Sequence, residues 1–310
     1  MRRFRVFALS ACVSLAALLP GSTVFADDRV PLDARPPVEN AHLVLRAFLV
    51  SYPDRVSGVD YDAEARDWYL TAGGKRFYWA RGRLLPAAER ADYAKWRPYV
   101  DYLYPRSVPD PEGFPPELVA RLSPRALSER RKNAAAYNIA FYDALYDGRT
   151  RRRIEAHITR FDYLGKRVSV HESIVAPLKR VEARIRALAG SDAEVERFLA
   201  SVSSVEGYNW REISDSPARS NHSWGIAVDI LPRNWGKKNI YWNWVSYWND
   251  RWMMISPDRR WTPPEAVITA FEDEGFVWGG KWLLWDTMHF EYRPELLTLQ
   301  RWGHAGEDFR

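Results

Sequence analysis

Apolar and polar residues alternate on both sides of a pair of glycines, Gly73-Gly74, in the segments DWYLTA (residues 67–72) and KRFYWA (residues 75–80). Alternation with a period of two is typical of strands, and two glycines between such segments favour a tight turn. The pattern therefore predicts a β-hairpin in this part of the chain.

Apolar residues recur with a helical period further along the chain. Their positions follow i, i+4, i+7, i+11 and i+14 in one set: Ile174, Leu178, Val181, Ile185 and Leu188. This spacing predicts an amphipathic helix. Two capping boxes, at residues 191–194 and 262–265, predict further helix starts, and the second helix is expected to have proline at its first position and to end at Gly275. Residues 128–146 also look helical, with a stop at Gly148.

Prolines divide the chain. Six of them fall within residues 104–124, which predicts a boundary between an N-terminal region, 27–125, and a C-terminal domain, 126–310. Strands and helices are mixed in the C-terminal part. We therefore expect an α+β fold, with a small antiparallel sheet, flanking helices and an N-terminal region that contains the hairpin.

The first 26 residues have the pattern of a secretory signal. Arginines precede an apolar stretch from Val6 to Leu19, and Val24-Phe25-Ala26 fits a cleavage site before Asp27. We therefore expect an exported protein, periplasmic or extracellular. The segment that ends at Cys12 also resembles a lipoprotein cleavage box, so a lipid anchor at Cys12 is the alternative to release as a soluble protein.

Composition and charge narrow the function classes. The chain has 46% hydrophobic and 27% charged residues, which excludes a disordered chain. Its formal charge of +5 becomes +2 without the three arginines of the signal, and no basic stripe indicates nucleic-acid binding. The run at residues 149–153 is interpreted as a solvated helix start. No later stretch is long enough for a membrane helix, and the oligomeric state is not determined.

Tryptophan is unusually frequent. The chain has 15 tryptophans, and 11 of them lie between Trp210 and Trp285. We expect most of them in the core. A few near the site would line a groove for a glycan or peptide.

Two short segments carry the candidate chemistry. The first places His222 seven residues before Asp229, on the apolar alternation of residues 226–230 that predicts a strand. The second places Asp286 three residues before His289. Because Cys12 is the only cysteine, a mature chain that begins at Asp27 would have to hold a metal with histidines and carboxylates. Two imidazoles and one carboxylate can hold Zn²⁺ and leave a fourth position for water.

The order SxHxxGxAxD followed by DxxHFE resembles the zinc D-alanyl-D-alanine carboxypeptidase and L-alanyl-D-glutamate endopeptidase family, peptidase family M15 or the LAS group. The matching residues are Ser220, His222, Gly225, Ala227 and Asp229, then Asp286, His289, Phe290 and Glu291. The segments 208–211 and 278–282 look like the endolysin-like branch of that family. The resemblance covers a motif core of residues 207–294, within a peptidase domain of residues 126–310.

The resemblance implies a role for each matching residue. His222, Asp229 and His289 match the ligands of one Zn²⁺ per chain, and Asp286 matches the acidic general base. Arg211 is similar to the arginine that faces the substrate carbonyl or carboxylate. Arg219 competes for that role because the spacing to the first ligand varies among members. Two further roles stay open, Ser220 as a support or a turn residue, and Glu291 as a support of a ligand or a surface carboxylate.

These features predict an exported zinc metallopeptidase that hydrolyses amide bonds in peptidoglycan stem peptides, as a carboxypeptidase or an endopeptidase. The alternative is a noncatalytic cell-wall-binding protein on the same fold. The tryptophans and the unassigned residues 27–125 favour that alternative, whereas the complete set of ligands and base favours the enzyme. The sequence leaves open which peptide bond is cut.

Overall fold

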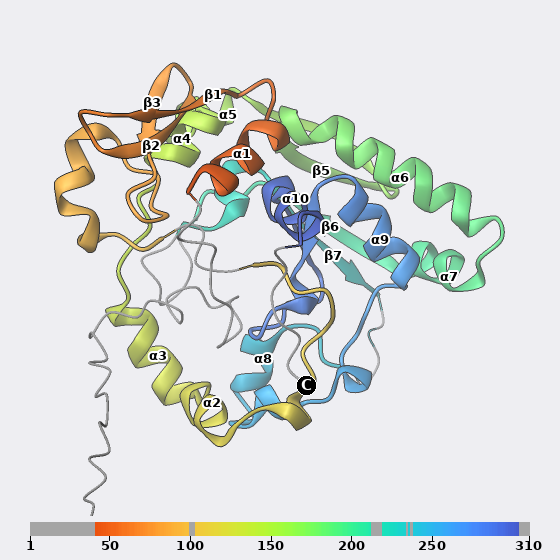
Figure 1. Cartoon of the computed structure of the whole chain (residues 1–310). Coiled ribbons are helices and arrows are strands. Elements are labelled where there is room, and N and C mark those ends of the chain that lie inside the picture. The colour runs from red at the N-terminus through yellow and green to blue at the C-terminus, as the bar shows by residue number, and fades with distance from the viewer. Residues whose placement is uncertain (1–40, 99–102, 212–218, 234, 236–237, 304–310) are drawn as a thin grey trace, which may run out of the picture.

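The computed structural model describes residues 41–98, 103–211, 219–233, 235 and 238–303. The signal segment and Cys12 lie outside these residues. Helices surround small antiparallel sheets, which confirms the α+β fold class (Figure 1). No helix among the described residues combines the length and the apolar character that crossing a bilayer requires.

A four-stranded antiparallel sheet forms the centre of the C-terminal part. Its strands lie in the order β6 (Val202–Glu206), β7 (Ala227–Pro232), β9 (His289–Tyr292) and β8 (Phe276–Trp278). The strand expected around Asp229 is therefore confirmed as β7. Val228 and Ile230 are fully buried in the main core, as their alternation predicts.

Helices cover this sheet and extend its core. They are α6 (Val175–Ala189), α7 (Ala193–Ser201), α9 (Glu265–Asp273) and α10 (Pro294–Arg301). The prediction of an amphipathic helix over residues 174–188 is confirmed by α6, which buries Leu178, Val181 and Ile185. The rings of Phe271 on α9 and Phe290 on β9 stack with their centroids 3.9 Å apart. This contact fixes α9 against the strand that carries His289.

The hairpin expected near Gly73-Gly74 is confirmed. Strands β1 (Val56–Asp62), β2 (Asp67–Ala72) and β3 (Lys75–Tyr78) form a three-stranded antiparallel sheet. Gly73 has a φ of +56°, and a Cβ at this position would lie 3.0 Å from the carbonyl oxygen of Ala144. Glycine therefore permits both the turn and its close approach to α4 (Ala140–Tyr146).

The core continues across the predicted boundary at residue 125. Helix α1 (Ala41–Ser51) packs along α10, and Phe48 meets the ring of Phe141 edge to face at 5.3 Å. The hydroxyl of Tyr52 donates a hydrogen bond of 2.7 Å to Glu295. The division at residue 125 stays a prediction. These contacts imply that truncating the buried face of α1 will lower the stability of the shared core.

Replacing Phe48 with alanine should lower the free energy of unfolding by about 3–5 kcal/mol, the usual cost of removing a buried phenylalanine. Phe48 is fully buried within the same core as α6 and β7. Denaturant unfolding measures the change. Val50→Ala on the exposed face of α1 is the matched control and should cost little. A loss well below 1 kcal/mol for Phe48→Ala would show that α1 is not part of this core.

The prediction of one helix over residues 128–146 is wrong. The chain forms two helices, α3 (Pro124–Asn133) and α4. Ala134 is extended, and the carbonyl of Ala136 accepts a hydrogen bond of 3.0 Å from the backbone of Arg97. Pairing with a distant segment replaces the intrahelical hydrogen bonds here.

Both predicted capping boxes are also corrected. Helix α7 is capped by Asp192 and not Ser191, because the Asp192 carboxylate accepts from the N–H groups of Glu194 and Val195. Helix α9 begins at Glu265 with Pro264 and not Thr262 as its N-cap residue, so it has no side-chain cap and no proline at its first helical position. The end of α9 just before Gly275 is as predicted.

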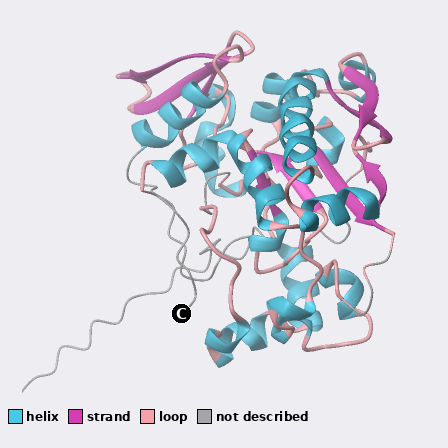
Figure 2. Cartoon of the chain, turned by 90° about the vertical axis from the view of Figure 1, so that its right-hand side faces the viewer, coloured by secondary structure: helices cyan, strands magenta, loops and turns pink. Residues whose placement is uncertain are grey.

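A second aromatic core lies at the end of the molecule opposite the β1–β3 sheet, around α2 (Pro116–Arg121), α3 and α8 (Trp242–Ser246) (Figures 1 and 2). Trp242, Trp252 and Trp285 are buried there. Trp224, Trp278 and Trp282 are buried elsewhere, so the core interpretation holds for these six tryptophans. Trp244 and Trp248, on and after α8, are exposed.

Candidate metal centre

Asp229 and His289 are opposite each other in neighbouring strands. The register of β7 and β9 pairs the two residues directly. Paired residues of antiparallel strands project on the same face of the sheet. The Asp229 Oδ1 and His289 Nδ1 atoms therefore lie 2.7 Å apart, in a buried position.

His222 reaches the same point from a short turn before β7. Residues Asn221–Trp224 form a single 3-10 turn, and the Ser220 hydroxyl accepts a hydrogen bond of 3.3 Å from the His222 backbone. Ser220 thus serves as a turn residue. Gly225 closes the turn with a φ of +67°, and a Cβ there would lie 2.7 Å from the backbone nitrogen of His171. The glycine of the motif is therefore needed to aim His222.

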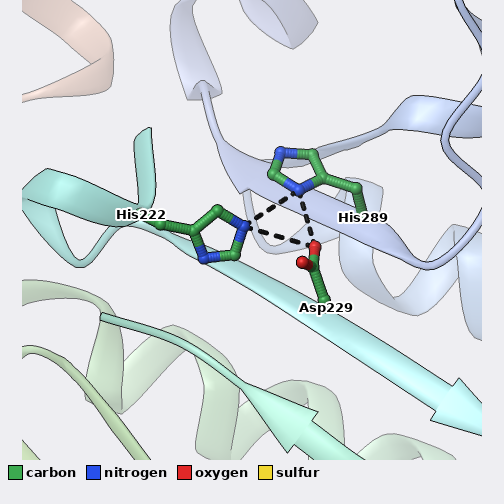
Figure 3. A group of neighbouring side chains, drawn as sticks. All are labelled: His222, Asp229 and His289. Atoms are coloured by element: carbon green, nitrogen blue, oxygen red, sulfur yellow. Dashed lines mark hydrogen bonds and ion pairs between the residues drawn. The ribbon is translucent and has the colours of Figure 1, made fainter. Parts of the chain in front are cut away.

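The three side chains converge (Figure 3). His222 Nε2 lies 3.3 Å from Asp229 Oδ1 and 3.3 Å from His289 Nδ1. One ligand atom of each residue lies within 4.8 Å of the others. Ligands about 2.0–2.1 Å from a tetrahedral Zn²⁺ would be about 3.3 Å from one another. Two of the three separations have this value, so the residues fit a metal ion.

The other nitrogen of each histidine is already engaged. His222 Nδ1 lies 2.7 Å from the carbonyl oxygen of Gly207, to which it can donate. His289 Nε2 lies 3.2 Å from Glu291 Oε2. Such partners fix the ring and its tautomer and leave one nitrogen as a metal ligand. The remaining nitrogens, His222 Nε2 and His289 Nδ1, point into the cluster (Figure 3).

Glu291 belongs to a buried polar chain that leads from the cluster to the N-terminal part. Its Oε2 accepts a hydrogen bond of 2.6 Å from Asn221. Its Oε1 lies 3.6 Å from Arg293, which also pairs with Glu295, the acceptor of the Tyr52 hydroxyl. Glu291 is 1% exposed, so it is a support of His289 and not a surface carboxylate.

Opposite charges dominate the electrostatics of the cluster. Burial alone raises the pKa of Asp229, but the two histidines outweigh it and hold the pKa far below its usual range. Burial alone lowers the pKa of His289, whereas the hydrogen bonds to Asp229 and Glu291 raise the pKa to about 10. Asp229 is therefore a carboxylate, and a metal ion between the three residues would take the place of the proton that His289 holds in its absence.

Asp286 lies in the turn just before β9. Its backbone N–H donates to Gly279 at 3.0 Å, and its carbonyl accepts from His289 at 3.3 Å. The carboxylate atom Oδ1 is buried and has no hydrogen-bond partner among the described residues. Burial and then the charge of Asp229 raise the pKa of Asp286 to about 8. Asp286 is not part of the three-residue cluster, although its charge interacts with two of the three residues.

The two candidate arginines occupy different environments. The Arg219 guanidinium is 11% exposed, pairs with Asp143 at 2.6 Å and lies 4.0 Å from the Trp210 ring. The Arg211 side chain is exposed, and its charge lowers the pKa of Asp286. No ion pair with Arg211 occurs within the described part of the chain. Arg219 is therefore held by a structural ion pair, whereas the exposed Arg211 has no such pair within the described residues and its charge acts on Asp286.

The sequence did not predict three residues that contact this centre or support it. Asn221 holds Glu291, and its only signal was its place beside His222. Tyr241 pairs with Asp286 through an isolated backbone bridge, and its phenol has a raised pKa, first because of burial and then because of Asp286. Glu295 lies outside the motif, and nothing in its sequence surroundings links it to the site.

Comparisons with known proteins bear on two segments of the chain. Residues 214–292 match a family model described as D-alanyl-D-alanine carboxypeptidase, which supports peptidase family M15 for this segment. Residues 44–101 match a domain of unknown function. No curated protein and no solved structure matches the chain. The first match includes all three residues of the converging cluster and indicates a hydrolytic enzyme.

Proposed function

We propose that this chain is an exported zinc peptidase that hydrolyses amide bonds in peptidoglycan stem peptides. The observation that carries the proposal is the convergence of His222, Asp229 and His289 within the segment that matches the carboxypeptidase family model. The signal pattern of residues 1–26 would bring the protein to the compartment that contains this substrate. Membership of the endolysin-like branch, which residues 208–211 and 278–282 resemble, is part of the same proposal.

His222 Nε2, Asp229 Oδ1 and His289 Nδ1 would hold one Zn²⁺. When bound, the ion supplies a Lewis acid that activates water near neutral pH and polarises the scissile carbonyl. Three protein ligands leave the open coordination position that a catalytic site needs. Within the described part of the chain the cluster contains three ligands and not four, which fits a catalytic rather than a purely structural site.

Asp286 would act as the general base. The unpartnered Oδ1 is free to accept a proton from water, and a pKa of about 8 keeps the carboxyl able to give that proton to the departing amine. A divalent cation nearby would favour the ionised carboxylate and bring this pKa down. Asp286 would thus take and deliver one proton in each turnover.

Arg211 would stabilise negative charge that develops on the substrate carbonyl oxygen. Replacing Arg211 with alanine should lower kcat by about 10²–10³, as loss of one oxyanion donor does elsewhere. Zinc content should not change. Steady-state hydrolysis of a muropeptide, with metal analysis of the same sample, measures both quantities.

Arg219→Ala is the matched comparison for this prediction. Because Arg219 pairs with the largely buried Asp143, its removal should lower the free energy of unfolding by about 3 kcal/mol. If Arg219→Ala still folds, it should keep most of the wild-type kcat. A fully active Arg211→Ala beside an inactive, folded Arg219→Ala would assign the role to Arg219.

Glu291→Gln should lower zinc affinity by about 10–100-fold, because partners of metal-bound histidines typically contribute that much. The amide keeps the shape of Glu291 but removes the charge that faces His289 Nε2. Competition with a fluorescent zinc chelator measures the affinity. Glu274→Gln, a carboxylate paired on the surface with Arg180, is the control and should bind zinc normally. Equal affinities in both variants would contradict a supporting role for Glu291.

The direct test of the proposed function is digestion of defined muropeptides by the zinc-loaded protein, with products identified by mass spectrometry. Loss of one terminal D-alanine indicates a carboxypeptidase, and cleavage between L-Ala and D-Glu indicates an endopeptidase. Both activities should disappear with a chelator and return with Zn²⁺. A zinc-loaded protein that binds peptidoglycan but releases no product would instead support a noncatalytic wall-binding protein.

A further inference from the structure

A large cleft contains the side chain of Arg211 and is built by both parts of the chain. It has a volume of about 1480 Å³ and is lined by the β2–β3 hairpin, residues 136–140, α4 and the segment that carries Arg211. A site for one small molecule usually has about 300–1,000 Å³. The cleft is therefore larger than a single small ligand requires and suits an extended one.

The cleft is strongly basic. Three carboxylates line it together with six cationic side chains, which gives a formal charge of +3, and the cations are Lys75, Arg76, Arg149, Arg153, Arg211 and Arg219. A concave surface with one sign of charge raises the local concentration of ligands of the opposite sign. The charge therefore indicates an anionic occupant.

All three carboxylates already have partners inside the fold. Asp143 accepts hydrogen bonds from Arg219 at 2.6 Å and from the Trp224 ring at 3.0 Å. Asp147 pairs with Arg153 at 2.6 Å. Glu89 accepts from the side chain of Asn138, which lines the same cleft. Asp143 and Asp147 are therefore each neutralised by an arginine of the cleft, whereas Glu89 keeps one negative charge, which the formal charge of +3 already includes.

Three cations of the cleft are left without a carboxylate in the described part of the chain. They are Lys75 on β3, Arg149 before α5 (Arg151–Glu155) and Arg211. Each of the three side chains is exposed. They come from three separate segments, one of them in the region of unknown function. Surface lysines and arginines are common, but three unpaired ones around one cavity form a site for several negative charges.

Arg211 connects this cleft to the metal centre. Its side chain lines the cleft, while its charge acts on Asp286 and its backbone N–H donates 2.9 Å to the hydroxyl of Ser223, next to His222. A ligand that extends from Lys75 past Arg149 to Arg211 would therefore reach the segment that packs against Ser223, the neighbour of His222. The cleft is placed to hold the part of a substrate that lies beyond the scissile bond.

We propose that this cleft binds the carboxylate-bearing part of an acidic peptide substrate, and that Lys75 and Arg149 select for its negative charge. This inference deepens the proposed peptidase function. The orientation of the peptide toward Asp286 rests on that proposed function. The inference gives the β1–β3 region a role in substrate selection. The ligand is a peptide with several free carboxylates, because three unpaired cations from separate segments suit several negative charges better than a single anion.

The test uses the full chain, depleted of metal by a chelator, so that binding is measured without hydrolysis. A fluorescently labelled peptide of alternating alanine and glutamate is titrated, beside the same peptide with glutamine in place of glutamate. The Lys75→Glu/Arg149→Glu variant should bind the acidic peptide about tenfold more weakly or worse, a change of about 1.4 kcal/mol. Its affinity for the glutamine peptide should stay at the wild-type level.

The control is Lys132→Glu/Lys179→Glu, which changes the net charge equally at exposed positions outside the cleft lining. At physiological ionic strength, charges further than about 8 Å from the peptide are largely screened. The control should therefore bind both peptides like the wild type. Equal weakening of acidic-peptide binding by the two variants would show a general charge effect and overturn the proposal. Unchanged binding in both variants would also overturn it.

A third probe, inorganic polyphosphate, tests whether the cleft prefers phosphates to peptide carboxylates. Inorganic polyphosphate should displace the acidic peptide less effectively than an unlabelled acidic peptide of equal charge does. Tighter binding of polyphosphate would overturn the proposal in favour of a phosphate polymer. If the peptide binds as expected but the zinc-loaded protein cuts no peptide, the proposed hydrolysis fails while the binding site stands.

Discussion

The His222→Ala/His289→Ala variant is expected to contain no stoichiometric zinc, whereas the wild-type chain should hold one ion per molecule. These histidines supply two of the three converging ligand atoms. Loss of a partner that merely supports a ligand costs about 10–100-fold in affinity, so loss of two ligands should cost far more. Elemental analysis after dialysis against a weak chelator measures the bound zinc.

Zinc binding should also raise the thermal stability of the wild type, because an ion that binds the folded chain shifts the unfolding equilibrium. The midpoint of thermal unfolding should rise with added Zn²⁺ in the wild type and not in the double variant. His157→Ala is the matched control, since His157 lies outside the cluster and pairs at 34% exposure with Asp147 and Glu172. A full complement of zinc in the double variant would disprove the ligand set.

Asp286→Asn should retain zinc and lose about 10²–10⁴ of kcat, the usual contribution of a positioned acid–base group. The amide has nearly the shape of the carboxylate but cannot accept the proton from water. Asp229→Ala should instead lose zinc affinity, because Asp229 Oδ1 is one of the three ligand atoms. Measuring zinc affinity and muropeptide turnover on both variants separates the two carboxylates.

Stability gives an independent check on Asp286→Asn. The raised pKa of about 8 means that the folded, metal-free chain holds this proton more tightly than the unfolded chain does. The ionised group therefore destabilises the metal-free fold as pH rises from about 4 toward 8, and the amide removes that effect. The variant should unfold at the wild-type temperature or above at pH 8. Asp162→Asn, an exposed control at 73% side-chain exposure, should change neither stability nor kcat.

If Asp286→Asn loses zinc while Asp229→Ala retains it, the two roles have been exchanged. If Asp286→Asn keeps both zinc and full turnover, another group accepts the proton. Either result would leave the position of the metal centre intact, because that position rests on the two histidines. The carboxylates and the histidines are therefore tested separately.

The sequence determined those features that depend on neighbouring residues. The alternation around Asp229 predicted β7, the glycine pair predicted the β2–β3 turn, and the heptad-like spacing from Ile174 predicted α6. Each signal is a period of apolar side chains or a backbone preference, and it acts over a few residues. The ligand types were also readable, because the motif lists them in order along the chain.

The tertiary structure decided everything that joins distant segments. Pairing of Asp229 with His289 across 60 residues depends on the strand register, which the buried faces of β7 and β9 set together. Asp192 caps α7 in place of Ser191, because Ser191 still belongs to the end of α6, where its N–H and hydroxyl donate to the carbonyl of Leu188. The helix expected over residues 128–146 breaks where Ala136 pairs with Arg97.

Electrostatic roles were likewise settled only by packing. The resemblance favours Arg211 and keeps Arg219 as its competitor, and only packing shows that Asp143 on α4 pairs with Arg219 while the charge of Arg211 acts on Asp286. Tyr52 joins the polar chain of Glu295 and Glu291 although 243 residues separate Tyr52 from Glu295. A local sequence pattern carries no information on such partners, because the free energy of a buried charge depends on which groups the whole fold brings to it.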